Sequence, residues 1–216
     1  LTRFIGRQGE MADITSLVLD PEVRLVTLLG PGGTGKTRLS LQAAKTLSPQ
    51  FSDGVSFVPL VDETDASQMI SRLAQTLDVK EGGRPLLESL KDFLREKHLL
   101  LILDNFEQLI ETAPILSDLL LHSPEVTLIV TSRIALNLRG EHVYHVPPLT
   151  SPASDDEISL STLLENEAVS LFVDRAQSAQ SGFSLSQDNA QAIVEICHKL
   201  DGLPLALELA AARIRL

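Results

Sequence analysis

Residues 25–37 read LVTLLGPGGTGKT, and this stretch decides the fold. Leu25–Leu29 is a short apolar run of the kind that forms a buried parallel strand. A glycine-rich turn follows at once, and a helical pattern begins at Lys36. The spacing G-x-x-x-x-G-K-T between a strand and a helix is that of a phosphate-binding loop. An ordinary glycine-rich turn is the alternative, and it is disfavoured because strand, loop and helix occur in this order.

The predicted loop has the chemistry that phosphate binding needs. Glycines let the backbone wrap around phosphate oxygens with its N–H groups pointing inward, and a helix N-terminus adds positive charge. Lys36 is expected to reach the β- and γ-phosphates of a nucleotide, and the Thr37 hydroxyl is expected to ligate Mg²⁺. The predicted phosphate-binding residues are Gly30, Gly32, Gly33, Thr34, Gly35, Lys36, Thr37 and Arg38.

Composition narrows the class of protein. The 216-residue chain is 44% hydrophobic, enough for a substantial core, and has no apolar run near the roughly 18 residues of a membrane span. Its formal net charge of −11 argues against direct nucleic-acid binding by this segment, because such binding depends on Lys and Arg. We therefore expect neither a membrane nor a nucleic acid as partner. The single cysteine, Cys197, agrees with a reducing, cytoplasmic compartment. Because the chain starts at Leu1, we expect a segment of a longer protein.

A second apolar strand delivers an acidic residue. Residues 98–103 read HLLLIL, and this strand ends on Asp104. In proteins with a phosphate-binding loop, an acid at the end of such a strand holds Mg²⁺ beside the nucleotide. An Asp at this place could also cap the next helix, but the upstream loop favours the Mg²⁺ role.

The pattern of strands and helices predicts an α/β fold. Strands are expected at 25–29, 55–59, 98–103, 126–130 and 141–146, with helices at 10–19, 36–47, 66–78, 85–96 and from Asp104 to about Leu121, irregular near Pro114. This alternation predicts a five-stranded parallel sheet with helices on both faces. The extra strand between the loop strand and the Asp104 strand is typical of RecA-like and AAA+ P-loop NTPases, and it predicts the strand order 5-1-4-3-2. In that order Arg133 emerges between Lys36 and Asp104.

The character of the chain changes after Pro148. We predict a nucleotide-binding core at 1–148, a linker rich in Ser, Thr and acids at 149–164, and a helical lid subdomain at 165–216 that continues past the last residue. Helices of the lid are expected at 165–180, 187–200 and 203–214.

Five motifs together resemble the STAND class of signalling ATPases, and within it the NB-ARC-like domains of bacterial transcription and signalling regulators. They are FIGR at 4–7, GPGGTGKT at 30–37, LLILDN at 100–105, TSR at 131–133 and GLPLALELAA at 202–211. The phosphate loop alone would indicate only a superfamily, whereas the GLPLA stretch after TSR is much more specific.

The resemblance implies further residues of the site. Phe4, Ile5 and Arg7 resemble the segment that packs around adenine and ribose, and the alternative is a packing role at the first helix. Arg133 resembles the sensor arginine that detects the γ-phosphate, because it can make charge-assisted hydrogen bonds to ATP that ADP cannot supply. Pro204 resembles the lid proline that touches the nucleotide, although proline also suits the first turn of any helix.

Departures from the family pattern concern hydrolysis. Many relatives carry a second acid directly after the Walker B aspartate, where this chain has Asn105, which cannot act as a base. Glu107 and the pair Asp62–Glu63 are the alternative carboxylates, and Gln8 replaces the usual acid after the first Gly-Arg. We therefore expect slow ATP hydrolysis. The predicted catalytic residues are Lys36, Asp104, Arg133 and Glu107.

The resemblance implies a nucleotide-operated switch. ATP or ADP, with Mg²⁺, is expected to bridge core and lid and to control the output of other domains of the same longer chain, or its self-association. A translocating or remodelling ATPase of the AAA+ or RecA type is an alternative, and Asn105 argues against it. A module that holds ADP permanently, without turnover, is the third reading.

Overall fold

The computed structural model describes residues 3–80, 82–152 and 159–214. The chain forms two compact units. The sheet unit comprises Gly9–Gly30 and Lys36–Val146, and the helical unit comprises Leu1–Gln8, Pro31–Gly35 and Pro147–Leu216. The predicted phosphate loop therefore has its two ends in the sheet unit and its middle in the helical unit.

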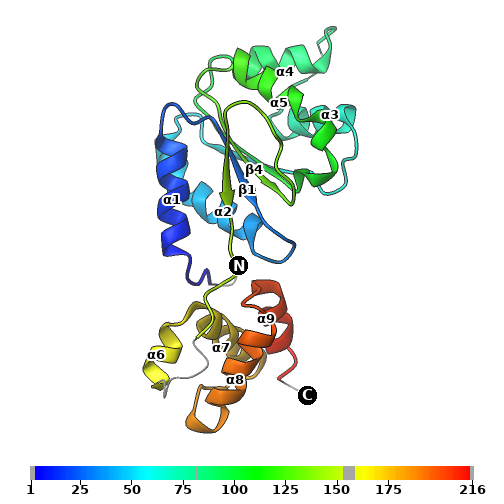
Figure 1. The fold of residues 1–216 in the computed structure, drawn as a ribbon. Helices are drawn as coiled ribbons and strands as arrows, with labels where there is room; N and C mark the ends of the chain where they lie inside the picture. Colours follow the sequence, from blue (N-terminus) through cyan, green and yellow to red (C-terminus); the bar gives the residue numbers. More distant parts are fainter. Residues whose placement is uncertain (1–2, 81, 153–158, 215–216) are drawn as a thin grey trace. The chain divides into compact units, whose positions relative to one another are not determined.

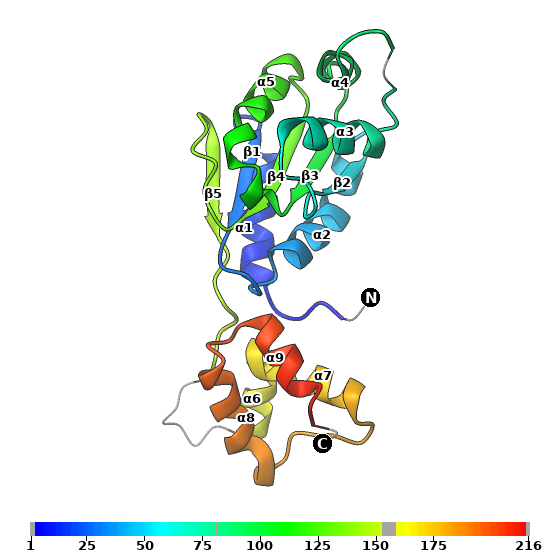
Figure 2. The same cartoon turned by 90° about the vertical axis from the view of Figure 1, so that its right-hand side faces the viewer.

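The sheet unit is built on parallel strands, all visible in Figure 2. They are β1 (Leu25–Leu29), β2 (Val55–Pro59), β3 (Leu100–Asp104), β4 (Thr127–Ser132) and β5 (Glu141–His145). Their order is β2-β3-β4-β1-β5, which is the predicted 5-1-4-3-2 counted from the opposite edge. The predicted α/β fold and strand order are thus confirmed.

Burial explains the composition of the strands. β3 and β4 are buried along their whole length, whereas the edge strands β2 and β5 are partly exposed. A central parallel strand is covered on both faces, so it is rich in Leu, Ile and Val throughout. Because all strands are parallel, their carboxyl ends meet at one edge of the sheet, where ligands bind in open α/β folds.

Helices cover both faces of the sheet (Figures 1 and 2). They are α1 (Gln8–Leu19), α2 (Lys36–Leu47), α3 (Ala66–Thr76), α4 (Leu86–Leu94) and α5 (Pro114–His122), with a short 3₁₀ helix η1 (Ser48–Gln50) after α2. Side chains of α3, α4 and α5 share a core with alternate residues of β1, β3 and β4, among them Leu101, Leu103 and Leu128. α1 and α2 lie on the opposite side of the sheet.

The predicted helix from Asp104 to about Leu121 is wrong. Two 3₁₀ helices, η2 (Phe106–Gln108) and η3 (Ile110–Thr112), occupy its first part, and α5 begins only at Pro114. The irregularity expected near Pro114 is the change from η3 to α5, which begins at Pro114. The physical reason is that proline lacks an N–H, which costs nothing in the first turn of a helix but removes a hydrogen bond in its interior.

The helical unit contains α6 (Leu160–Glu165), α7 (Glu167–Ala179), α8 (Gln187–Lys199) and α9 (Pro204–Ala211). Its core is formed by buried side chains that include Phe172, Cys197 and Leu207. Burial raises the pKa of the Cys197 thiol to about 11, so this thiol is protonated at neutral pH and serves packing. Among the residues described here, no helix is both long and apolar enough to cross a membrane.

The helix predicted at 165–180 is confirmed as α7, whereas α6 is an additional short helix that the sequence did not predict. The Asn166 side chain accepts hydrogen bonds from the N–H groups of Ala168 and Val169 at 3.1 and 3.2 Å, which caps the start of α7 and breaks the chain direction. α6 begins inside the predicted linker, of which residues 153–158 lie outside the described part of the chain. The domain limits drawn from the sequence stay a prediction.

Gly202 connects α8 to α9 and opens the GLPLA motif. Its backbone is left-handed, with φ of 63°, and a Cβ added to it would overlap the carbonyl oxygen of Leu149. Its own carbonyl accepts the Leu149 N–H at 2.9 Å. Pro204 is then the first residue of α9. The letters GLP therefore encode a left-handed turn followed by a helix start.

Candidate functional site

Lys36 is the first residue of α2 and follows the phosphate loop directly. Its Nζ donates a hydrogen bond to the carbonyl oxygen of Gly30 at 2.7 Å, so the side chain folds back over the start of the loop. Burial lowers the pKa of Lys36 below its ordinary value; Glu107 opposes this shift, Arg133 adds to it, and Asp104 opposes it. Lys36 is therefore within electrostatic range of three charged residues.

Asp104 is buried at the end of β3 and accepts two hydroxyl hydrogen bonds on the same oxygen. Thr37 Oγ1 donates to Asp104 Oδ1 at 2.7 Å, and Thr131 Oγ1 donates to it at 2.6 Å. Thr131 also accepts the backbone N–H of Asn105 at 3.0 Å. Adjacent strands β3 and β4 thus bring Asp104 and Thr131 together, while the loop brings Thr37 to them.

The donor set at Asp104 fits Mg²⁺. This ion takes hard oxygen ligands and is usually held by one or two protein side chains together with phosphate oxygens. The Thr37 hydroxyl and the Asp104 carboxylate are such ligands, and their separation of 2.7 Å allows both to face one cation. These are the two residues that would hold the ion, as the sequence predicts.

Asn105 adopts a left-handed conformation, with φ of 65° and ψ of 53°. Asn is one of the few residues other than glycine that tolerate it. This turn ends β3, directs the Asn105 N–H to Thr131, and leads into η2, where Phe106 is fully buried. Glu107 directly follows the buried Phe106.

Arg133 and Glu107 form an ion pair. The distance from Arg133 Nε to Glu107 Oε1 is 3.1 Å, and the exposed fractions of the two side chains are 61% and 17%. Strand β4 lies between β1 and β3, as predicted. Arg133 follows β4, so it emerges between Lys36, which follows β1 and the phosphate loop, and Asp104, which ends β3. Its role as γ-phosphate sensor stays a prediction, as does a catalytic role for Glu107.

The alternative carboxylate after β2 is engaged elsewhere. Glu63 is buried, and its Oε1 accepts a hydrogen bond from Arg72 Nε at 2.6 Å, which also forms an ion pair. Its other oxygen is buried without a hydrogen-bond partner in the described residues. Asp62, by contrast, is exposed. Glu63 thus forms an ion pair with Arg72 of α3, and this contact competes with a role as a general base.

Within the helical unit, Arg7 and Leu205 hold the middle of the phosphate loop. Arg7 Nη2 donates to the Thr34 carbonyl at 3.1 Å, and the Leu205 N–H donates to the Gly33 carbonyl at 3.2 Å. A Cβ added at Gly33 would lie 3.2 Å from Leu205 Cβ, and one at Gly35 would lie 3.9 Å from Pro204 Cγ. The start of α9 therefore adjoins the loop, and the unit brings together three predicted segments.

The remaining predicted contacts have more local roles. Ile5 packs against the core of the helical unit, and the Arg7 N–H donates to Glu167 Oε1 at 2.6 Å. These contacts give the FIGR segment a packing function within the helical unit, whereas the alternative drawn from the sequence was a packing role at the first helix. Contacts of Phe4, Ile5, Gly32 and Arg38 with a nucleotide stay predictions.

The fold and this cluster define a P-loop NTPase: a parallel sheet of this order, a G-x-x-x-x-G-K-T loop between β1 and α2, and an aspartate at the end of β3. A family model described as "AAA domain" matches residues 22–140, and the chain belongs to this family. The chain is therefore an AAA-type P-loop ATPase domain, a nucleotide-binding class.

Relatives extend this assignment. An uncharacterized protein of Mycobacterium tuberculosis is 38% identical over 215 residues, which are 99% of this chain and 51% of that protein. A candidate HTH-type transcriptional regulator of the same organism is 39% identical over 194 residues, or 89% of this chain and 20% of the regulator. The chain thus spans about half, or less, of the length of these relatives.

The solved structures include a STAND protein with a tetratricopeptide repeat sensor from Pyrococcus horikoshii. It superposes with a TM-score of 0.60 at 20% identity, covering 98% of this chain and 30% of that chain. At this identity the likeness concerns the fold. It agrees with the resemblance to the STAND class that the five sequence motifs indicate, and that resemblance is confirmed.

Two contacts in the site were not predicted from the sequence. Thr131 was quoted as part of TSR, but its bridge between Asp104 and the Asn105 backbone was not foreseen. The strand pairing gives a signal for this contact. Leu103 of β3 pairs with Val130 of β4, so the residues that follow them, Asp104 and Thr131, lie side by side at the ends of the two strands. The pairing of Glu107 with Arg133 has no such signal, since Glu107 lies on the 3₁₀ helix η2 and Arg133 lies beyond the end of β4.

The bridging role of Thr131 leads to a prediction. Thr131→Val removes the acceptor of the Asn105 N–H and a donor to Asp104 in a buried place, so we expect a loss of about 1–3 kcal/mol in unfolding free energy, measured by urea denaturation. Thr27→Val is the matched control, because the Thr27 hydroxyl on β1 is buried and makes no hydrogen bond within the described residues. Equal losses in both variants would contradict the bridge.

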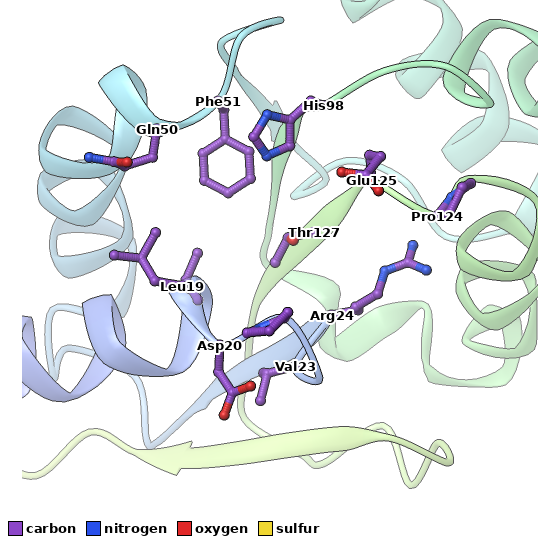
Figure 3. A pocket seen from close by; sticks show the side chains of 12 residues that line it. Leu19, Asp20, Val23, Arg24, Gln50, Phe51, His98, Pro124, Glu125 and Thr127 are labelled. Atoms are coloured by element: carbon purple, nitrogen blue, oxygen red, sulfur yellow. The ribbon is translucent and has the colours of Figure 1, made fainter.

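A cavity of about 290 Å³ lies at the other end of the sheet unit (Figure 3). The Phe51 and His98 rings, 5.0 Å apart, form one wall. Arg24 lies on another side, but its Nε and Nη2 donate to the Val126 carbonyl at 3.1 and 2.9 Å, and Nη2 also donates to Ser123. The cavity is at the amino ends of β1 and β4, so it is separate from the phosphate-loop site.

Proposed function

We propose that this domain binds ATP and ADP with Mg²⁺, hydrolyses ATP slowly, and uses its nucleotide state to control the output of a larger signalling or transcription regulator. The observation that carries the proposal is the cluster at the carboxyl ends of β1, β3 and β4. There Lys36, Thr37, Asp104 and Arg133 combine two positive charges with the oxygen ligands of a divalent cation.

Each residue of the cluster has a role in the proposal. Lys36 moves from the Gly30 carbonyl to phosphate oxygens, for which its ammonium group has a stronger electrostatic attraction. Thr37 and Asp104 hold Mg²⁺, which neutralises phosphate charge when bound. Arg133 binds the γ-phosphate, which ADP lacks. Thr131 orients the Asp104 carboxylate.

Slow turnover follows from what the carboxylates already do. Asp104 accepts two hydroxyl hydrogen bonds, and Glu63 pairs with Arg72. Asn105 has no proton-accepting carboxylate. A general base raises rates by about 10²–10⁴-fold, so a site whose acids are committed to other partners is expected to hydrolyse slowly.

The division of the phosphate loop supports a switch. The loop is one continuous stretch whose ends belong to the sheet unit and whose middle belongs to the helical unit, where Gly33 and Thr34 carbonyls accept hydrogen bonds from Leu205 and Arg7. In the proposal, the nucleotide phosphates bind the backbone of this one stretch of chain. Turning a switch from 1:99 to 99:1 needs about 5.5 kcal/mol of differential binding, which the γ-phosphate contacts would supply. We also assign Phe4–Arg7 and Pro204 to nucleotide contact.

The test compares ADP with a non-hydrolysable ATP analogue on the 216-residue chain. At about 100 times Kd, either ligand is expected to add about 2.7 kcal/mol of stability, and the melting temperature rises accordingly. We expect the two ligands to give different small-angle scattering profiles. Identical profiles and equal melting shifts would contradict the switch, and absence of any shift would contradict nucleotide binding.

The same preparation tests the ADP-holding module, which the engaged carboxylates favour as a second candidate. ADP retained through purification, with no measurable phosphate release, would support that reading over slow hydrolysis. Turnover above about 1 s⁻¹, stimulated by DNA or a protein substrate, would instead favour a motor.

A further inference from the structure

Glu107 was considered above as a candidate base, but its geometry suggests another role. Its Oε1 is 3.1 Å from Arg133 Nε, the guanidinium nitrogen closest to the chain. In this position the Glu107 carboxylate is engaged by the Arg133 guanidinium. The contact thus joins the proposed γ-phosphate sensor to the one carboxylate that follows Walker B on η2.

We propose that Glu107 is the partner of Arg133 in the absence of a γ-phosphate, and that ATP must take Arg133 away from Glu107 whereas ADP need not. The inference rests on the proposed function, which assigns Arg133 to the γ-phosphate. Glu107 would then set the discrimination between ATP and ADP. It acts through Arg133, so it is a positioning residue.

The backbone on both sides of the ion pair is fixed. Phe106, directly before Glu107, is fully buried, and the Leu109 N–H closes η2 by donating to the Phe106 carbonyl at 2.8 Å. Next to Arg133, the Ile134 N–H donates to Ser132 Oγ at 3.1 Å. Only the long side chain of Arg133, which is 61% exposed, has room to exchange one partner for another.

Electrostatics place this exchange beside the phosphate loop. The charges of Glu107 and Arg133 both act on the pKa of Lys36, in opposite directions. Both therefore lie within Coulomb range of the ammonium that is expected to meet the β- and γ-phosphates. A γ-phosphate there would attract Arg133 and repel Glu107.

The strengths of the two contacts favour the exchange. An ion pair with a largely exposed arginine is weak, because water screens it and the side chain loses freedom. Arginine and phosphate form two-pronged, charge-assisted hydrogen bonds that are stronger. Glu107 therefore lowers the affinity for ATP modestly without preventing ATP from binding.

The experiment measures Kd for ADP and for a non-hydrolysable ATP analogue by calorimetry, in wild type and in Glu107→Gln. Gln keeps the size of the side chain and removes its charge. We expect affinity for the ATP analogue to rise about two- to fivefold more than affinity for ADP, the range that an exposed ion pair provides. The gain is expected to vanish when Glu107→Gln is combined with Arg133→Ala.

Glu111→Gln is the matched control, because Glu111 is an exposed carboxylate four residues on and lines the same surface depression as Glu107. It is expected to shift both affinities equally, since it changes only the general charge. Single-turnover hydrolysis is measured alongside for both variants.

The outcomes separate the inference from the proposed function. An unchanged ratio of the two affinities in Glu107→Gln, with both nucleotides still bound, overturns the inference alone. Loss of hydrolysis with an unchanged ratio also overturns it and makes Glu107 the base. Failure of the wild-type chain to bind either nucleotide overturns the proposed function and the inference with it.

Discussion

Lys36→Ala is expected to weaken ATP binding by about 10- to 100-fold, the equivalent of losing one hydrogen bond to a charged group at about 1.5–3 kcal/mol. The wild-type ammonium is partly desolvated at the start of the loop and has the Gly30 carbonyl as its partner at 2.7 Å. Its transfer to phosphate oxygens exchanges a neutral acceptor for a charged one. Titration calorimetry with ATP, ADP and Mg²⁺ measures the effect.

Lys45→Ala is the control for this variant. Lys45 is an exposed lysine in the last turn of the same helix, so its loss changes the net charge equally without touching the loop. Its affinity for ATP is expected to match that of the wild type. If both variants lost the same amount, general charge and not a contact from Lys36 would explain binding.

Gly202→Ala is expected to cost about 3 kcal/mol or more of stability, and to lower the melting temperature by about 6 °C or more. Two effects add. The backbone there is left-handed, which alanine adopts only with strain, and the new Cβ would overlap the Leu149 carbonyl oxygen. That oxygen belongs to backbone, so no side-chain rotation relieves the overlap. Thermal unfolding followed by circular dichroism measures the loss.

Gly9→Ala tests whether the effect depends on place. Gly9 is in the first turn of α1, and a Cβ added to it meets no atom within 4 Å. Alanine is the better helix former, so this variant is expected to gain about 0.5–1 kcal/mol. A Gly202→Ala protein as stable as the wild type would show that the chain from Leu149 to α9 adapts, contrary to the geometry described.

The sequence by itself predicted the sheet and the residues at its carboxyl edge. Apolar runs such as Leu25–Leu29 specify central strands, and the phosphate-loop spacing together with one extra strand before Asp104 specifies the strand order. Once the strands are parallel, Lys36, Asp104 and Arg133 must follow the ends of neighbouring strands. Each of these steps depends on local pattern and on general rules of α/β connection.

Apolar spacing and motif patterns did not predict the irregular turns. The 3₁₀ helices before Pro114 fell inside a segment predicted as one helix, and α6, which the Asn166 cap separates from α7, fell inside the predicted linker. A period of apolar residues shows which side of a segment is buried, but it does not show where the hydrogen-bond ladder is interrupted. Single side chains decide that, through a missing N–H in one case and a capping amide in the other.

Only the tertiary structure decided which partners the site residues take. Glu107 meets Arg133, Thr131 joins Asp104 to the Asn105 backbone, and Gly202 lies against Leu149. Each contact links residues from 26 to 53 positions apart, through turns with left-handed or 3₁₀ geometry. Side-chain contacts form over a few ångströms, so they depend on where such turns direct the chain. The sequence alone therefore predicted the phosphate loop, whereas only the folded chain shows which residues contact Arg133 and Asp104.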